Sequence, residues 1–221
     1  MKKIIVLLLI TVMAVGLMAG CGSQEAGGEK GTVYVYCFGD YFDPELEYQF
    51  EEETGYDVVI DLFDTNEEMY PVIKNNTAQY DVICASDYMI ERLISEDLLA
   101  EINYDNVPNA SNIADNIKPF MEEFDPGMVH SLPHTWGTYG IMYNKTMVNS
   151  EIDSWEDLWD TQYSGQIVMP NSMREGFMIA AKLLGYSMNT TDEAQIKEMT
   201  DKLIEQKPLV YSFDNDSARE K

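Results

Sequence analysis

Basic residues are scarce in this sequence. Fourteen Lys and Arg stand against 39 Asp and Glu in 221 residues, which sets the formal net charge at -25. Because proteins bind nucleic acid by neutralising phosphates with clustered Lys and Arg, this deficit argues against a nucleic-acid partner. The excess of carboxylates favours cationic partners instead.

Cysteine and histidine are also rare, at three and two residues. Three Cys exclude a disulfide-rich scaffold. His130 and His134 are four residues apart, but Pro133 between them disfavours a helix that would place both imidazoles on one face, so we expect no metal site. The sequence also lacks a glycine-rich phosphate loop, a nucleophile elbow and a Cys-x-x-Cys motif. We therefore expect neither a cofactor nor enzymatic activity.

Long apolar runs are confined to the N-terminus. Lys2 and Lys3 precede an apolar run over residues 4–18, a pattern typical of a secretory signal at residues 1–20. The run is shorter than the roughly 20 apolar residues that a bilayer span needs. Loss of the two lysines with the signal would change the net charge from -25 to -27.

Residues 17–21, Leu-Met-Ala-Gly-Cys, resemble the lipobox of bacterial lipoproteins, with Met18 where Leu is more usual. The resemblance implies that Cys21 becomes the lipidated first residue of the mature chain. Residues 21–31 are rich in Gly and polar side chains and predict a flexible tether. We expect an extracytoplasmic protein that meets the membrane only through its lipid. The alternative is a secreted protein in which Cys21 is incidental.

The remaining chain alternates between strand and helix patterns. A hydrophobic content of 45% predicts a packed globular protein. Strands alternating with helices over short connections predict an α/β fold with mainly parallel sheets covered by helices on both faces. We expect a first lobe over residues 32–136 and a partial second lobe over residues 137–221. Expected strands are 33–36, 56–62, 80–84, 167–169 and 208–213; expected helices are 44–53, 65–75, 87–94, 154–159, 174–185 and 190–206.

Two details of this pattern are open. Pro71 lies inside the expected helix over residues 65–75 and predicts a late helix start or a kink. Cys37 and Cys84 end two strands that would be neighbours in a doubly wound sheet. They can form a disulfide, although buried free thiols are the favoured interpretation.

Aromatic and acidic residues gather where the expected strands end. Parallel sheets bind ligands at the carboxyl ends of their strands. Carboxylates pair with ammonium groups and aromatic faces attract cations, so convergence of these residues would suit a small amine. Each also has a structural explanation, such as a solvated surface carboxylate, a helix-dipole partner or a core aromatic. The candidate ligand-binding residues are Phe38, Asp40, Tyr41, Ser86, Tyr88 and Glu175.

At these residues the chain resembles the spermidine/putrescine-binding proteins of bacterial ABC transporters, a branch of the type II extracellular solute-binding family. The resemblance spans residues 32–221 and depends on the order and spacing of many short stretches. They are residues 36–41 (Tyr-Cys-Phe-Gly-Asp-Tyr), 49–50, 53–55, 66–70 (Asn-Glu-Glu-Met-Tyr), 80–83, 86, 88, 133, 136–137, 154–159 (Ser-Trp-Glu-Asp-Leu-Trp), 174–175, 184–187 and 189–192.

The resemblance implies a fold like that of type II periplasmic binding proteins, in which two lobes close on an extended polyamine. Such a receptor would be a monomer that passes its ligand to ABC permease subunits. It also implies site roles: Phe38 and Tyr41 flank the methylenes, Asp40 faces an amine, Ser86 and Tyr88 add wall contacts, and Glu175 pairs with an ammonium group. Family members run well past residue 221, so we expect a truncated chain with an incomplete second lobe.

Three positions depart from the family pattern. Phe38 stands where the family often has Trp, Gly39 where it often has Thr, and Ser172 where an acidic residue helps to hold an amine. The choice between putrescine and spermidine therefore stays open. The alternatives are the same fold with another amine, an amino acid, a sugar or a ferric ion, or an anchored enzyme or adhesion module.

Overall fold

The computed structural model describes residues 30–39 and 41–215. The predicted signal, Cys21, Asp40 and the chain after Asn215 lie outside the described residues. The chain divides into two compact units. The described part of one comprises residues 30–33 and 43–59, and that of the other comprises residues 34–39, 41–42 and 60–215.

The smaller unit is built around helix α2, Pro44–Thr54. Asp43 caps its start by accepting a hydrogen bond of 3.0 Å from the Glu45 N–H, and Pro44 at the first position already has a helical φ. The helix ends at Gly55, whose φ of 73° is the left-handed conformation that glycine adopts without strain. Along the helix itself no residue is buried.

A parallel pairing organises the first sheet. Its strands are β1 (Thr32–Phe38), β2 (Asp57–Phe63) and β3 (Val82–Cys84), in the order β2-β1-β3. Cys37 of β1 lies in register with Cys84 of β3, which confirms that these two strands are neighbours. Both thiols are free, and burial raises the pKa of Cys37 and raises that of Cys84 to about 11.

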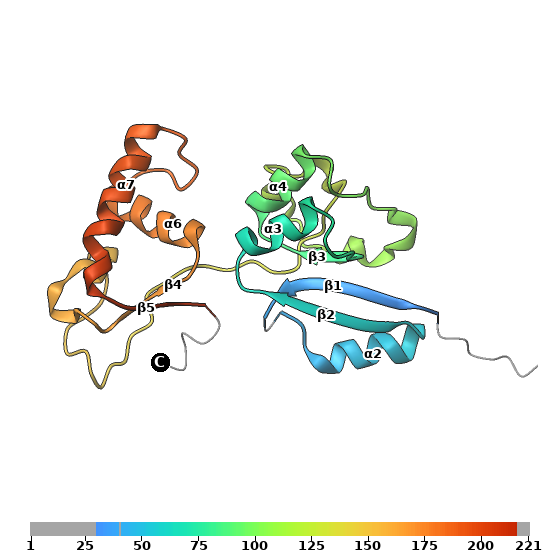
Figure 1. Ribbon diagram of the computed structural model, residues 1–221, viewed down its shortest axis with the longest axis horizontal. Helices are drawn as coiled ribbons and strands as arrows, with labels where there is room; N and C mark the ends of the chain where they lie inside the picture. Colours follow the sequence, from blue (N-terminus) through green and yellow to red (C-terminus); the bar gives the residue numbers. More distant parts are fainter. Residues whose placement is uncertain (1–29, 40, 216–221) are drawn as a thin grey trace, which may run out of the picture. The chain divides into compact units, whose positions relative to one another are not determined.

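Two helices pack on this sheet. Helices α3 (Asn66–Lys74) and α4 (Asp87–Ser95) lie on the same face (Figure 1). They bury a core with the two longer strands, formed by Tyr36, Phe63, Met69, Met89 and Leu93. Met69 of α3 and Leu93 of α4 are completely buried, so the apolar face of each helix is directed at the core beside the sheet.

Of the two outcomes expected at Pro71, a late start of α3 or a kink, the late start is wrong. The helix begins directly after Thr65, whose side chain accepts a hydrogen bond of 3.2 Å from the Glu68 N–H, and it runs through Pro71. Proline inside a helix removes one backbone hydrogen bond. The N-cap and the complete burial of Met69 outweigh that loss here.

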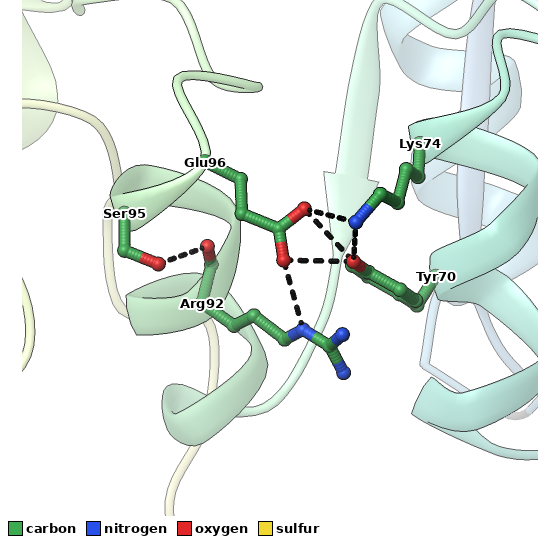
Figure 2. A network of polar contacts seen from close by, with 5 residues as sticks. All are labelled: Tyr70, Lys74, Arg92, Ser95 and Glu96. Atoms are coloured by element: carbon green, nitrogen blue, oxygen red, sulfur yellow. Dashed lines mark hydrogen bonds and ion pairs between the residues drawn. The ribbon is translucent and has the colours of Figure 1, made fainter.

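A polar network joins α3 to the C-terminal end of α4 (Figure 2). Both carboxylate oxygens of Glu96 accept from the Tyr70 hydroxyl, at 2.7 and 2.8 Å. Lys74 lies 2.9 Å and Arg92 3.1 Å from the same carboxylate. The Arg92 guanidinium also lies 3.7 Å from the centre of the Tyr70 ring, a cation–π contact.

The second sheet pairs β4 (Ile167–Pro170) with β5 (Val210–Asp214) in parallel. Helices α6 (Met173–Leu184) and α7 (Glu193–Gln206) pack together beside it (Figure 1). Helix α7 begins after Asp192 and not at Thr190 as expected. The remaining helical segments are short: η1 (Tyr104–Asn106), η2 (Pro108–Asn112), α5 (Lys118–Met121), η3 (Pro126–Met128), η4 (Trp155–Trp159), η5 (Thr161–Tyr163) and η6 (Lys207–Leu209).

Residues 131–144, between the two sheets in the sequence, form neither helix nor strand. The buried Asp125 fixes the start of this segment, because its carboxylate accepts hydrogen bonds from the N–H groups of Val129, His130 and Ser131 and from the Ser131 hydroxyl. In the described part of the chain, no helix combines the length and apolar character of a membrane span.

Candidate ligand-binding site

A large cavity of about 1230 Å³ lies at the carboxyl ends of strands from both sheets. Four of the six predicted site residues line it: Phe38, Tyr41, Ser86 and Glu175. Phe38 ends β1, Ser86 follows β3, and Glu175 is in the first turn of α6 after β4. The parallel strands therefore bring together residues that are up to 137 positions apart in the sequence.

The charge of the cavity wall has one sign. Four carboxylates line the cavity, from Asp64, Asp157, Glu175 and Asp214. Among the described residues that form the wall, there is no Lys, Arg or His. Such a wall attracts cations and repels anions.

Aromatic rings form another part of the wall. The Phe38 and Tyr41 rings have their centres 5.2 Å apart, and Phe38 also packs on the buried Phe63 at 4.4 Å. Contact with the core therefore holds the Phe38 ring in place. An aromatic wall of this kind packs against methylene groups and attracts cations to the ring faces.

Asn66 organises the hydroxyl groups beside this aromatic wall. It is only 5% exposed and lines the cavity. Its Nδ2 lies 3.0 Å from both Ser86 Oγ and Tyr88 Oη, and its Oδ1 accepts a bond of 3.2 Å from the Ser86 N–H. Tyr88 does not line the cavity but is hydrogen-bonded to Asn66, which does. Burial and its hydrogen bond to Glu67 raise the pKa of Tyr88.

One carboxylate oxygen of Glu175 is left without a hydrogen bond in the cavity wall. This oxygen, Oε2, is buried. Burial, together with the charge of the neighbouring Glu175 carboxylate and a hydrogen bond to it, raises the pKa of Tyr139 to about 12. A buried carboxylate oxygen without a partner is costly, and an ammonium group is the partner that would satisfy it.

Arg174, although adjacent to Glu175 in the sequence, is directed elsewhere. Its guanidinium donates to the Met188 carbonyl at 3.2 Å and to Asn189 Oδ1 at 2.6 Å. It also lies 5.6 Å from the centre of the Tyr88 ring. Arg174 therefore does not neutralise Glu175 by an ion pair, since no such pair is found among the described residues.

Asp64 links the ends of three strands at the edge of the cavity. Its Oδ2 accepts a hydrogen bond of 3.0 Å from Asn171 Nδ2, which follows β4. Its Oδ1 accepts one of 3.1 Å from Asn215 Nδ2, which follows β5. These donors are neutral amides, so the hydrogen bonds bring no positive charge to the Asp64 carboxylate beside the cavity.

The two histidines hold backbone segments. One ring nitrogen of His130 lies 3.2 Å from the Ala100 carbonyl oxygen, and one of His134 lies 3.2 Å from the Tyr41 carbonyl oxygen. Within residues 30–39 and 41–215, His, Cys, Asp and Glu form no group of three or more that could hold a metal ion.

The cavity also contains residues that the sequence did not single out, among them Asp64, Asn66 and Tyr139. Asn66 was visible only as the start of a capped helix. Asp64 was one acidic residue among many. Tyr139 lay in the segment between the two sheets without a neighbouring motif. Asp40, one of the six predicted ligand-binding residues, lies outside the described residues.

Parallel β/α units around a wide cavity at their strand ends define the chain as a solute-binding type of protein. Residues 47–220 match the family described as bacterial extracellular solute-binding protein. The chain belongs to this family. Its α/β fold is that of the periplasmic binding proteins.

Individual relatives agree with this assignment. The spermidine/putrescine-binding periplasmic protein of Escherichia coli K12 is 31% identical over 93% of this chain and 59% of its own length. The spermidine/putrescine ABC transporter substrate-binding protein PotD of Streptococcus pneumoniae has 38% identity and a TM-score of 0.65, covering 86% of this chain and 58% of that one. The TpPotD lipoprotein of Treponema pallidum has 25% identity and a TM-score of 0.73, covering 84% and 58%. The chain thus spans about 59% of the length of its curated relative.

Proposed function

We propose that this chain belongs to a polyamine receptor that captures spermidine or putrescine outside the cytoplasm and delivers it to an ABC permease without altering it. The observation that carries the proposal is the buried, unpartnered Oε2 of Glu175 in a cavity wall that has four carboxylates and, among its described residues, no basic group. The Escherichia coli and Streptococcus pneumoniae relatives, both named for spermidine and putrescine, support the same ligand class.

The physical properties of a polyamine match this wall. A polyamine carries several ammonium charges on an apolar stem. Its charges need carboxylate partners when they leave water, and its stem needs apolar or aromatic surface. In the proposed complex Glu175 pairs with an ammonium group, Phe38 and Tyr41 pack on the stem, and Ser86 accepts a hydrogen bond. Tyr88 acts through the Asn66 network, and Asp40 is proposed from the sequence alone to face a second amine.

The proposal includes the cellular setting. Lipid on Cys21 would anchor a monomeric receptor at the outer face of the cytoplasmic membrane, where it would meet the permease. This part comes from the N-terminal sequence. The TpPotD protein, itself a lipoprotein, offers a precedent in a relative.

Calorimetric titration of the full protein, as its gene encodes it, tests the ligand. Putrescine or spermidine should bind, and Glu175→Gln should weaken binding about tenfold or more, because a charged partner is replaced by a neutral one. Glu193→Gln is the matched control: Glu193 is also in the first turn of a helix but does not line the cavity. Its affinity should stay within about twofold of wild type. The absence of binding heat with both polyamines would remove the proposal.

A further inference from the structure

The side-chain amide of Asn66 has only one orientation that satisfies its neighbours. The Ser86 N–H can only donate, and it lies 3.2 Å from Oδ1. The two Nδ2 hydrogens therefore point to Ser86 Oγ and Tyr88 Oη, each at 3.0 Å. Because Asn66 is 5% exposed, water cannot easily replace these bonds.

This orientation determines how the two hydroxyl groups are used. Tyr88 donates its only hydrogen to Glu67 Oε1 at 2.9 Å and accepts from Asn66, so its position is fixed from two sides. Ser86 Oγ accepts one hydrogen from Asn66 and keeps a second lone pair. Of the two, Ser86 is the one that lines the cavity.

We propose that Asn66 is a positioning residue for ligand binding: it holds Ser86 Oγ so that this oxygen accepts a hydrogen bond from an ammonium group in the cavity. The inference rests on the proposed function, since it requires an amine ligand. Without Asn66 the Ser86 side chain can rotate among its rotamers, and binding then includes the cost of restoring one of them. The residue acts through Ser86 and need not touch the ligand.

A purely structural role for Asn66 has a different consequence. A buried amide that only stabilises the fold would lower the free energy of unfolding when removed, but its effect on affinity would not depend on Ser86. A double-mutant cycle separates the two roles, because residues that act through one contact are not additive.

The test is putrescine and spermidine affinity by calorimetry for the full protein, Asn66→Ala, Ser86→Ala and the double variant. Each single substitution should weaken binding about fivefold, the size expected for one lost hydrogen bond. The double variant should bind within about twofold of the weaker single variant. Gln206→Ala is the matched control, because Gln206 is a buried amide that does not itself line the cavity and donates to the Leu158 backbone carbonyl. It should lower stability and leave affinity within about twofold.

Additive losses, or no loss in Ser86→Ala, would overturn the inference. If Asn66→Ala does not fold, Asn66→Ser takes its place in the cycle, since it removes the amide and adds no charge to the cavity wall. The coupling to Ser86→Ala is then the measured quantity, and additivity again counts against the proposal. No binding of either polyamine by the wild-type protein would instead refute the proposed function.

Discussion

Glu96 is held as an anion by residues from two helices. Hydrogen bonds from Lys74, Tyr70 and Arg92, in that order of importance, lower its pKa to about 2 from an ordinary value of 4.5 (Figure 2). A carboxyl group whose pKa is lower in the folded state stabilises the fold above its unfolded pKa. This contribution falls as the pH drops from about 4.5 to about 2.

Glu96→Gln should therefore reduce stability at neutral pH and make little difference near pH 2. The measurement is the urea midpoint of wild type and variant between pH 2 and pH 7. Glu91→Gln serves as the control and should behave like wild type, because Glu91 is an exposed residue of α4, the helix that ends just before Glu96. A constant gap between Glu96→Gln and wild type over the whole pH range would contradict the assigned role.

Single residues also show how far sequence reasoning extends. The convergence of Phe38, Tyr41, Ser86 and Glu175 on one cavity was predictable because the ends of parallel strands meet at one edge. Asn66 was not, since its contacts with Ser86 and Tyr88 join positions 20 and 22 residues away and leave no periodic signal. The free state of Cys37 and Cys84 agrees with the favoured interpretation.

At the level of elements, helix starts depend on which side chain reaches the first free N–H groups. Asp192 accepts hydrogen bonds from the N–H groups of Ala194 at 2.8 Å and Gln195 at 3.0 Å, and α7 begins after it. The sequence pattern had placed the start of this helix at residue 190. Thr190 instead donates to the Gln195 side chain at 2.6 Å.

Asp192→Ala should lower the free energy of unfolding by about 1 kcal/mol, the usual cost of losing an N-cap. Urea unfolding can be followed by tryptophan fluorescence, to which Trp159 contributes; its indole N–H donates to the Lys202 carbonyl of α7 at 2.9 Å. Asp192→Asn retains the acceptor oxygen and should recover most of the stability. Equal losses in both variants would mean that the negative charge, and not the cap, stabilises this helix start.

Most strands and helices followed from the sequence because their apolar spacing is regular. The exceptions arose where local rules compete. Pro71 predicted a late start or a kink in α3, yet the cap at Thr65 and the packing of Met69 maintain the helix from Asn66 onward. Such competition is decided by burial, which a local pattern does not contain.

For the whole molecule, the N-terminal sequence makes a prediction about location. Lipid on Cys21 would insert acyl chains into the membrane, and each buried CH₂ adds about 0.8 kcal/mol of binding. Wild-type protein should therefore sediment with membranes, while Cys21→Ala should appear in the soluble extracytoplasmic fraction. Mass spectrometry of the N-terminal peptide should show the added lipid. An unmodified Cys21, or wild-type protein in the soluble fraction, would count against the anchor.

The sequence by itself determined the α/β class, the acidic character and the strand ends at which a ligand would bind, because periodicity, composition and turn position are local properties. Only the tertiary structure decided that Asp64, Asn66 and Tyr139 share the cavity with Glu175 and that Arg174 is directed away from it. The reason is physical: which charges neutralise each other and which remain open to a ligand depends on distances between residues far apart in the chain.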